Sequence, residues 1–133
     1  MRKARALKHL QTLGLFFVFA VFLIGGLAHF VYLDLFTRVV PAYIPFPRTV
    51  VQLTGICELV GAVALLFKPL RRLAGWAFAL YLVCVMPVHI DMLIHAERWL
   101  YLVSMTFLWV RPFLQPVLIA LVLWATRPVA ATG

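Results

Sequence analysis

The stretch TVVQLTGICELVGAVALLF, residues 49–67, decides the fold that the rest of the chain implies. It is almost wholly apolar, and as an α-helix it would extend about 29 Å, which matches the hydrocarbon core of a bilayer. Its one formal charge, Glu58, stands near the middle. A carboxyl group at that depth is costly unless it is partnered or protonated. Because helical spacing puts Gly55, Glu58 and Ala62 on one face, we expect this face to contact other helices rather than lipid.

Composition places the whole chain in the membrane. The 133 residues are 65% hydrophobic and only 12% charged, whereas a soluble domain carries about 25% charged residues. We expect a single transmembrane domain over residues 1–133, with no room for a separate soluble catalytic domain. The net charge is +8, but the basic residues flank apolar runs. They therefore indicate topology and contacts with anionic lipid, and not nucleic-acid binding.

Four apolar segments are long enough to cross a bilayer as helices. We predict them at residues 10–33, 49–67, 73–94 and 109–126. The basic start and the apolar run that follows resemble a signal peptide, but the run is too long and ends without a small-residue cleavage site. The first segment is therefore predicted to be a retained helix. The prolines of the last segment, Pro112 and Pro116, are expected in its early turns.

The connections between these segments differ in composition. Residues 34–48 hold three prolines within seven residues, which prevents a regular helix, and are predicted to form an outer loop over the mouth of the bundle. Residues 68–72, KPLRR, are predicted to form a basic inner turn whose proline ends the preceding helix. Residues 95–108 include Trp99 and are predicted to be an amphipathic segment at the outer membrane surface, with the start of a long last helix as the alternative.

The basic residues predict the orientation of the chain. Antiparallel crossings place eight Lys and Arg residues on one side and four on the other. The eight are Arg2, Lys3, Arg5, Lys8, Lys68, Arg71, Arg72 and Arg127, and the four are Arg38, Arg48, Arg98 and Arg111. Because cytoplasmic segments carry the excess of positive charge, both termini are expected inside. We therefore predict an all-α membrane protein, an antiparallel four-helix transmembrane bundle (N-in/C-in) in a bacterial inner (cytoplasmic) membrane.

No catalytic pattern appears in the sequence. Cys57 and Cys84 both lie in apolar runs and form no Cys-x-x-Cys motif, so we expect them to be buried as small hydrophobic residues, with a disulfide between them left open. The chain has no Gly-x-Ser-x-Gly motif, no cysteine paired with a nearby histidine and no phosphate-binding glycine loop. The sequence therefore favours a protein that is not an enzyme on its own.

Antiparallel packing would gather ionisable and amide side chains in the outer half of the membrane, whereas the inner half carries almost no polar side chain. The candidates come from all four predicted helices and are His29, Glu58, His89, Asp91, Arg111 and Gln115. Ionisable groups inside a membrane usually face the protein interior or a cavity and are candidates for function. This cluster is therefore the candidate site.

Four interpretations of the cluster stay open. It could be a structural network in which Arg111 neutralises Glu58 and the polar groups fix the helix register. It could line a cavity for an amphipathic ligand such as a quinone, whose carbonyls histidine and arginine would hold. It could form a proton or small-solute path with Glu58 changing charge. It could be a metal site at His29, Glu58 and His89, although no His-x-x-x-His or Glu-x-x-His spacing arranges these ligands in advance.

Six short segments, in their order and spacing, resemble the DoxX-like family of small bacterial membrane proteins over about residues 14–126. They are GLAHF (26–30), VPAYIP (40–45), GICEL (55–59), RRLAGW (71–76), PVHIDM (87–92) and RPFLQ (111–115). The resemblance implies a four-helix bundle and an association with redox membrane systems, including a thiosulfate:quinone oxidoreductase subunit and oxidative-stress complexes. It thus implies other membrane subunits as partners and a quinone as the candidate cofactor.

The sequence and this resemblance together favour an accessory, non-catalytic subunit of a redox-linked membrane assembly. A small proton-linked carrier and a purely structural subunit of a larger membrane complex are the alternatives.

Overall fold

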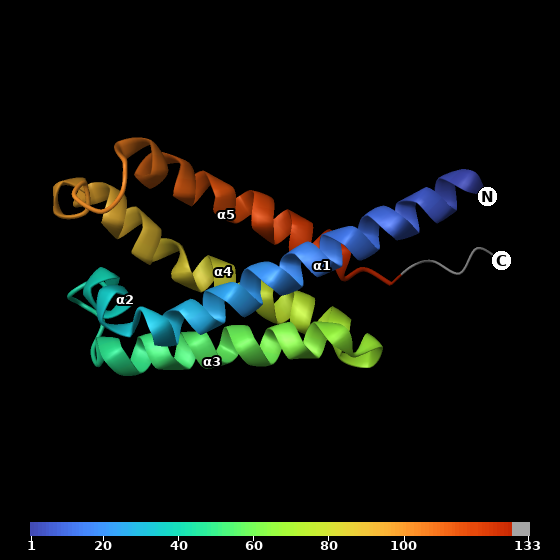
Figure 1. Ribbon diagram of the computed structural model, residues 1–133, viewed down its shortest axis with the longest axis horizontal. Helices are drawn as coiled ribbons and strands as arrows, with labels where there is room; N and C mark the ends of the chain where they lie inside the picture. Colours follow the sequence, from blue (N-terminus) through green and yellow to red (C-terminus); the bar gives the residue numbers. More distant parts are fainter. Residues whose placement is uncertain (129–133) are drawn as a thin grey trace.

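The computed structural model of the protein describes residues 1–128. Within this range the chain is helical and contains no strand. The elements in order are α1 (Arg2–Val31), α2 (Leu33–Val39), α3 (Pro47–Leu66), α4 (Lys68–Ile94), the 3₁₀-helix η1 (Ala96–Arg98) and α5 (Met105–Ala125) (Figure 1).

Four of these helices, α1, α3, α4 and α5, are long and apolar enough to cross a membrane. Large apolar side chains stay exposed along them, among them Phe16, Leu53, Leu80 and Val117. Such continuous apolar exposure is unfavourable in water and suits a lipid environment. The prediction of an all-α protein with four helices suited to cross a membrane is confirmed for residues 1–128.

The long helices pack as two pairs. α1 lies against α3, α4 lies against α5, and contacts between α3 and α4 and between α1 and α5 join the pairs. The start of α1 and the end of α5 lie at one end of the molecule, which we call the terminal end (Figure 1). α2 and η1 lie at the opposite end, which we call the loop end. Towards the loop end the α4–α5 pair diverges from the α1–α3 pair (Figure 1).

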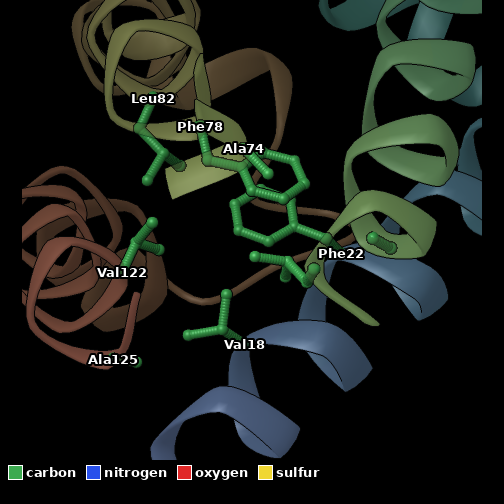
Figure 2. Packing of buried hydrophobic residues seen from close by; sticks show 9 residues of the cluster. Val18, Phe22, Ala74, Phe78, Leu82, Val122 and Ala125 are labelled. Atoms are coloured by element: carbon green, nitrogen blue, oxygen red, sulfur yellow. The ribbon is translucent and has the colours of Figure 1, made fainter. Parts of the chain in front are cut away.

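An apolar core fills the space between the two pairs on the side of the terminal end. Its buried members come from all four long helices and are Val18, Phe22, Ala62, Leu65, Ala74, Phe78, Leu82, Val122 and Ala125 (Figure 2). The rings of Phe22 and Phe78 stack with their centroids 3.7 Å apart. These side chains come from different helices, so their packing holds the two pairs together here.

The contact between α1 and α3 depends on glycine. A Cβ atom on Gly26 would stand 2.8 Å from two atoms of the Leu59 side chain, and one on Gly55 would stand 2.7 Å from the Cβ atom of His29. Small residues allow two helices to approach this closely. Gly55, Glu58 and Ala62 are all buried on α3, so the prediction that this face contacts protein is confirmed.

Two predicted boundaries near the start of the chain are wrong. α1 begins at Arg2, and not near residue 10, because the basic N-terminal segment contains no helix breaker and continues the helix. The predicted outer loop at residues 34–48 is helical in its first part, where α2 covers Leu33–Val39. The three prolines begin at residue 41, so they restrict only the second part of this segment.

The predicted turn at residues 68–72 belongs to α4, which begins at Lys68. Only Phe67 separates it from the last residue of α3. Pro69 therefore starts a helix and does not end one. A proline fits this position because the first turn of a helix leaves its N–H groups without helical partners.

The last helix starts earlier than residue 109. Ser104 caps it, because its Oγ atom accepts a hydrogen bond from the Phe107 N–H at 3.2 Å. Pro112 and Pro116 consequently lie inside α5, and not in its early turns as predicted. In the preceding segment Trp99 is buried against Ala96 and Leu108. That tryptophan packs on the protein, whereas the sequence predicted an anchor at the membrane surface.

Candidate functional site

A cavity of about 620 Å³ occupies the space between the helix pairs on the side of the loop end. All five α-helices and the segments that follow α2 and η1 contribute to its wall. Most of the lining is apolar, including Phe36, Val85, Trp99 and Leu118. Ligand sites usually measure about 300–1,000 Å³ and combine an apolar wall with a few polar groups. The size and lining of this cavity match that description.

Glu58 lies on the buried face of α3 and borders the cavity, with 7% of its surface exposed. Its Oε1 atom accepts a hydrogen bond from the Tyr81 hydroxyl of α4. Its Oε2 atom lies 3.6 Å from Nδ1 of His29 and has no hydrogen-bond partner within residues 1–128. One oxygen of this buried carboxyl group is thus satisfied by protein, and the other is left for a further donor.

The position of His29 is set by its own helix and by α2. Its Nδ1 atom lies 2.7 Å from the carbonyl oxygen of Gly25. Because a carbonyl oxygen only accepts, Nδ1 is the donor, and in a neutral ring Nε2 then carries the free lone pair. The ring packs edge-on against Phe36, with the centroids 4.8 Å apart. α2 therefore helps to orient a histidine that lines the cavity.

Arg111 and Gln115 form a second polar group on α5. Gln115 is fully buried, its Oε1 atom accepts a hydrogen bond from Arg111 Nη1 at 3.0 Å, and its Nε2 atom donates to the carbonyl oxygen of Leu82 at 3.1 Å. Gln115 thus joins α5 to α4 and holds the guanidinium group at the wall of the cavity. In the described part of the chain Arg111 makes no other hydrogen bond and no direct ion pair with Glu58. The pairing of Arg111 with Glu58, which the structural interpretation assumed, is therefore not present.

His89 also lines the cavity, and its Nδ1 atom is buried without a hydrogen-bond partner among residues 1–128. Buried polar atoms without partners are uncommon, and each one calls for an explanation. Within the described residues the two such side-chain atoms are Glu58 Oε2 and His89 Nδ1. Both residues border the same cavity, so a ligand with hydrogen-bonding groups could satisfy both.

The structure brings together five of the six residues that the sequence singled out: His29, Glu58, His89, Arg111 and Gln115. Asp91 is not among the residues that line the cavity. Its Oδ1 atom lies 3.4 Å from Nδ1 of His95, one helical turn further along α4. Because residues two apart on a helix face different directions, His89 and Asp91 cannot both face the cavity on a regular helix.

Tyr81 is a site residue that the sequence argument missed. It lines the cavity and donates the hydrogen bond to Glu58. A signal was present, because Tyr81 precedes His89 by eight residues and so shares its helix face.

Metal ligands do not converge in the described part of the chain. No group of three or more His, Cys, Asp or Glu side chains there is arranged to hold a metal ion. His29 and Glu58 are adjacent, whereas His89 lines the same cavity without completing a group of three with them among the described residues. The three residues of the metal interpretation therefore do not form one ligand set.

The two cysteines are free and exposed, contrary to the prediction that they are buried. Cys84 lines the cavity, and Cys57 does not. Cys57 directly precedes Glu58, so a helix that turns the carboxyl group inward turns this thiol outward.

Comparison of the chain with known protein families gives a match to one family. The family described as "Domain of unknown function (DUF8561)" matches residues 18–127. The chain belongs to the DUF8561 family. The matched region contains every polar residue that lines the cavity, so the candidate site lies within the DUF8561 domain. No curated protein and no solved structure matches this DUF8561 chain.

Proposed function

We propose that this DUF8561 protein binds an amphipathic molecule, a quinone or a lipid, inside the membrane. In this proposal it serves as an accessory, non-catalytic subunit of a redox-linked membrane assembly. The observation that carries the proposal is the apolar cavity of about 620 Å³ with Glu58 Oε2 and His89 Nδ1 unpartnered at its wall. An apolar wall suits a ring and its hydrophobic tail, and the polar atoms suit a head group.

The polar groups suit a quinone head because they include donors on both helix pairs. Arg111 on α5 has guanidinium N–H groups left over after its hydrogen bond to Gln115. On the other pair, a protonated His29 ring would present an N–H group, and Glu58 would present either a proton or an acceptor. A quinone carries carbonyl acceptors on opposite sides of its ring, and a quinol carries hydroxyl groups there. Such a ligand would meet hydrogen-bonding groups at both ends.

The membrane and the orientation are part of the same proposal. An antiparallel four-helix transmembrane bundle in a bacterial inner membrane, with both termini cytoplasmic, follows from the distribution of basic residues. The starts of α1 and α4 and the end of α5 carry most of them. Positive residues of short connecting segments are retained on the cytoplasmic side. The cavity would then open towards the outer half of the membrane.

The resemblance to DoxX-like proteins supports the redox-linked role. Four of the six matching segments supply His29, Glu58, His89, Arg111 and Gln115, which all line the cavity. The association of that family with quinone-linked oxidoreductases agrees with a quinone as the ligand. A partner subunit would supply the electron-transfer chemistry, because no catalytic motif stands in this sequence.

Two alternatives explain less of the geometry. A purely structural polar network would fix the helices without a cavity, and its members would satisfy one another. A proton-linked carrier uses the buried Glu58, but the apolar core around Phe22 and Phe78 fills the space between the cavity and the terminal end. Transport would therefore require a second conformation in which that core opens.

The binding proposal is tested by the ligand that remains bound during purification. Protein extracted in a mild detergent would be analysed by native mass spectrometry, followed by organic extraction and chromatography of the released molecule. We expect a quinone in the wild-type protein and at least about tenfold less in Glu58→Ala and Arg111→Ala, because each change removes a hydrogen bond that involves a charged or ionisable group.

Arg38→Ala is the matched control for Arg111→Ala, because Arg38 is exposed on α2 and does not line the cavity. It should retain the quinone. Absence of any quinone from well-folded wild-type protein, with both site variants equally well folded, would reject the proposal. Proton flux in liposomes that Glu58→Gln abolishes would instead support the carrier.

A further inference from the structure

A second pocket, of about 170 Å³, lies at the terminal end, and it shares no residue with the cavity. It is formed where the N-terminal half of α1, the start of α4 and the end of α5 meet. Its lining residues are Lys8, Gln11, Thr12, Leu15, Arg71, Ala125 and Arg127. The pocket is too small for a drug-sized ligand and matches a compact head group.

Three cationic side chains converge on this pocket from three different segments. Lys8 belongs to α1, Arg71 to the first turn of α4, and Arg127 follows α5. No acidic residue lines the pocket, and none of the three cations forms an ion pair in the described part of the chain. All four acidic residues of the protein lie between residues 34 and 97. Positive charges brought together without a counter-charge repel one another, and an anion would relieve that repulsion.

Hydrogen bonds to the backbone shape the pocket. Arg71 donates from Nε to the carbonyl oxygen of Leu65 at 2.9 Å, which orients the guanidinium group and leaves both of its Nη groups for another acceptor. Gln11 donates from Nε2 to the carbonyl oxygens of Trp124 and Arg127, at 2.9 and 3.0 Å. Gln11 thereby fixes the end of α5 against α1 and keeps the backbone of Arg127 beside Lys8. Hydrogen bonds therefore hold the Arg71 guanidinium group and the backbone of Arg127 in place, and the exposed side chains of Lys8 and Arg127 complete the lining.

We propose that Lys8, Arg71 and Arg127 form a binding site for a phosphate group, carried by an anionic phospholipid. The site lies where three membrane-spanning helices begin or end, which is the level of the lipid head groups. Basic pockets between transmembrane helices bind phosphate head groups on the cytoplasmic side. Guanidinium groups suit phosphate because they donate two parallel hydrogen bonds to its oxygens. A free phosphate ion shares this chemistry, and the experiment separates the two sources.

The experiment measures lipid binding by the purified full-length protein. Native mass spectrometry in a neutral detergent would record how much phosphatidylglycerol or phosphatidylcholine is retained at a series of lipid concentrations. A parallel arm would add inorganic phosphate alone and record the thermal unfolding temperature. We expect wild-type protein to prefer phosphatidylglycerol, and Lys8→Gln and Arg127→Gln each to weaken its binding about fivefold.

Matched controls separate a site from general surface charge. Lys68→Gln and Arg2→Gln remove the same charges near the same end of the protein, from exposed residues that do not line the pocket. They should leave lipid binding unchanged. Arg71→Gln should also weaken binding, but it removes the hydrogen bond to Leu65, so Lys8→Gln and Arg127→Gln keep the test independent of folding.

Each outcome decides the question. If inorganic phosphate raises the unfolding temperature of wild-type protein but not of Lys8→Gln, while phosphatidylglycerol is not preferred, the site stands and its ligand is free phosphate. If Lys68→Gln weakens lipid binding as much as Lys8→Gln does, the effect is general electrostatics and the proposed site is wrong. Equal binding of phosphatidylglycerol and phosphatidylcholine, without any response to phosphate, would also overturn it.

Discussion

The carboxyl group of Glu58 lies directly over Gly25: a Cβ atom built on Gly25 would stand 2.6 Å from Glu58 Oε2. The missing side chain on α1 thus makes the space in which an acid of α3 is buried. The same residue provides the carbonyl oxygen that holds His29. One glycine therefore positions two of the polar groups at the cavity wall.

Gly25→Ala should destabilise the protein by about 1–3 kcal/mol, because the added methyl group would force the buried carboxyl group to move. The direction of this change in stability is informative, since Gly→Ala inside a helix normally stabilises by about 0.5–1 kcal/mol. The free energy of unfolding in detergent, measured by denaturant titration, checks this. In a Glu58→Ala background the same change should cost less, and an equal cost in both backgrounds would contradict the contact.

Tyr81→Phe should lower the free energy of unfolding by about 1 kcal/mol, because it removes the hydrogen bond to Glu58 and leaves that carboxyl group with less support. Quinone retention should fall with it. The control is Tyr43→Phe, which alters a tyrosine that is 70% exposed in the segment after α2. A similar loss of stability in both variants would mean that the Tyr81 hydroxyl group makes no specific contribution.

Gln115→Met keeps the size of a fully buried side chain but removes its hydrogen bonds to Arg111 and Leu82. We expect a loss of about 1–3 kcal/mol in stability, because the guanidinium group loses its buried partner. Thermal unfolding in detergent would measure it. Gln52→Met is the comparison, since Gln52 is half-buried on α3 and its side chain makes no hydrogen bond in the described part of the chain. Equal effects of the two changes would refute this role of Gln115.

The two cysteines provide a test of cavity occupancy. Cys84 lines the cavity and Cys57 does not, and both are free. In single-cysteine variants, Cys57→Ala and Cys84→Ala, a lipid-soluble maleimide should label both thiols. A short-chain quinone should slow the labelling of Cys84 several-fold and leave Cys57 unaffected. If both rates respond equally, the quinone acts through the detergent or lipid and does not enter the cavity.

The sequence predicted the structure correctly where one property, hydrophobicity or helical spacing, held over a whole segment. Long apolar runs predicted four membrane-spanning helices, and the spacing of Gly55, Glu58 and Ala62 predicted which face of α3 is buried. It was less successful at the ends of helices. Residues 34–40 were predicted to be a loop only because they were grouped with the proline-containing residues 41–48. Pro69 is compatible both with the end of one helix and with the start of the next.

In the candidate site, too, the sequence identified some residues correctly and misplaced or missed others. His29, Glu58, His89, Arg111 and Gln115 were recognisable because ionisable and amide groups in apolar runs are costly and few. Asp91 satisfied the same rule and lies outside the cavity, paired with His95. Tyr81 was missed because an aromatic side chain is common in a membrane helix, and its hydroxyl group gains meaning only when Glu58 is seen beside it.

By itself the sequence determined which segments are long and apolar enough to span a membrane, and which polar residues need partners there. These properties depend on local hydrophobicity and helical period, which neighbouring residues in the chain decide. Only the tertiary structure decided that Glu58 is hydrogen-bonded to Tyr81 and lies beside His29 rather than pairing with Arg111, and that diverging helix pairs leave a cavity between them. Those outcomes depend on how closely separate helices approach, and residues far apart in the chain, such as Gly25 and Glu58, set that distance together.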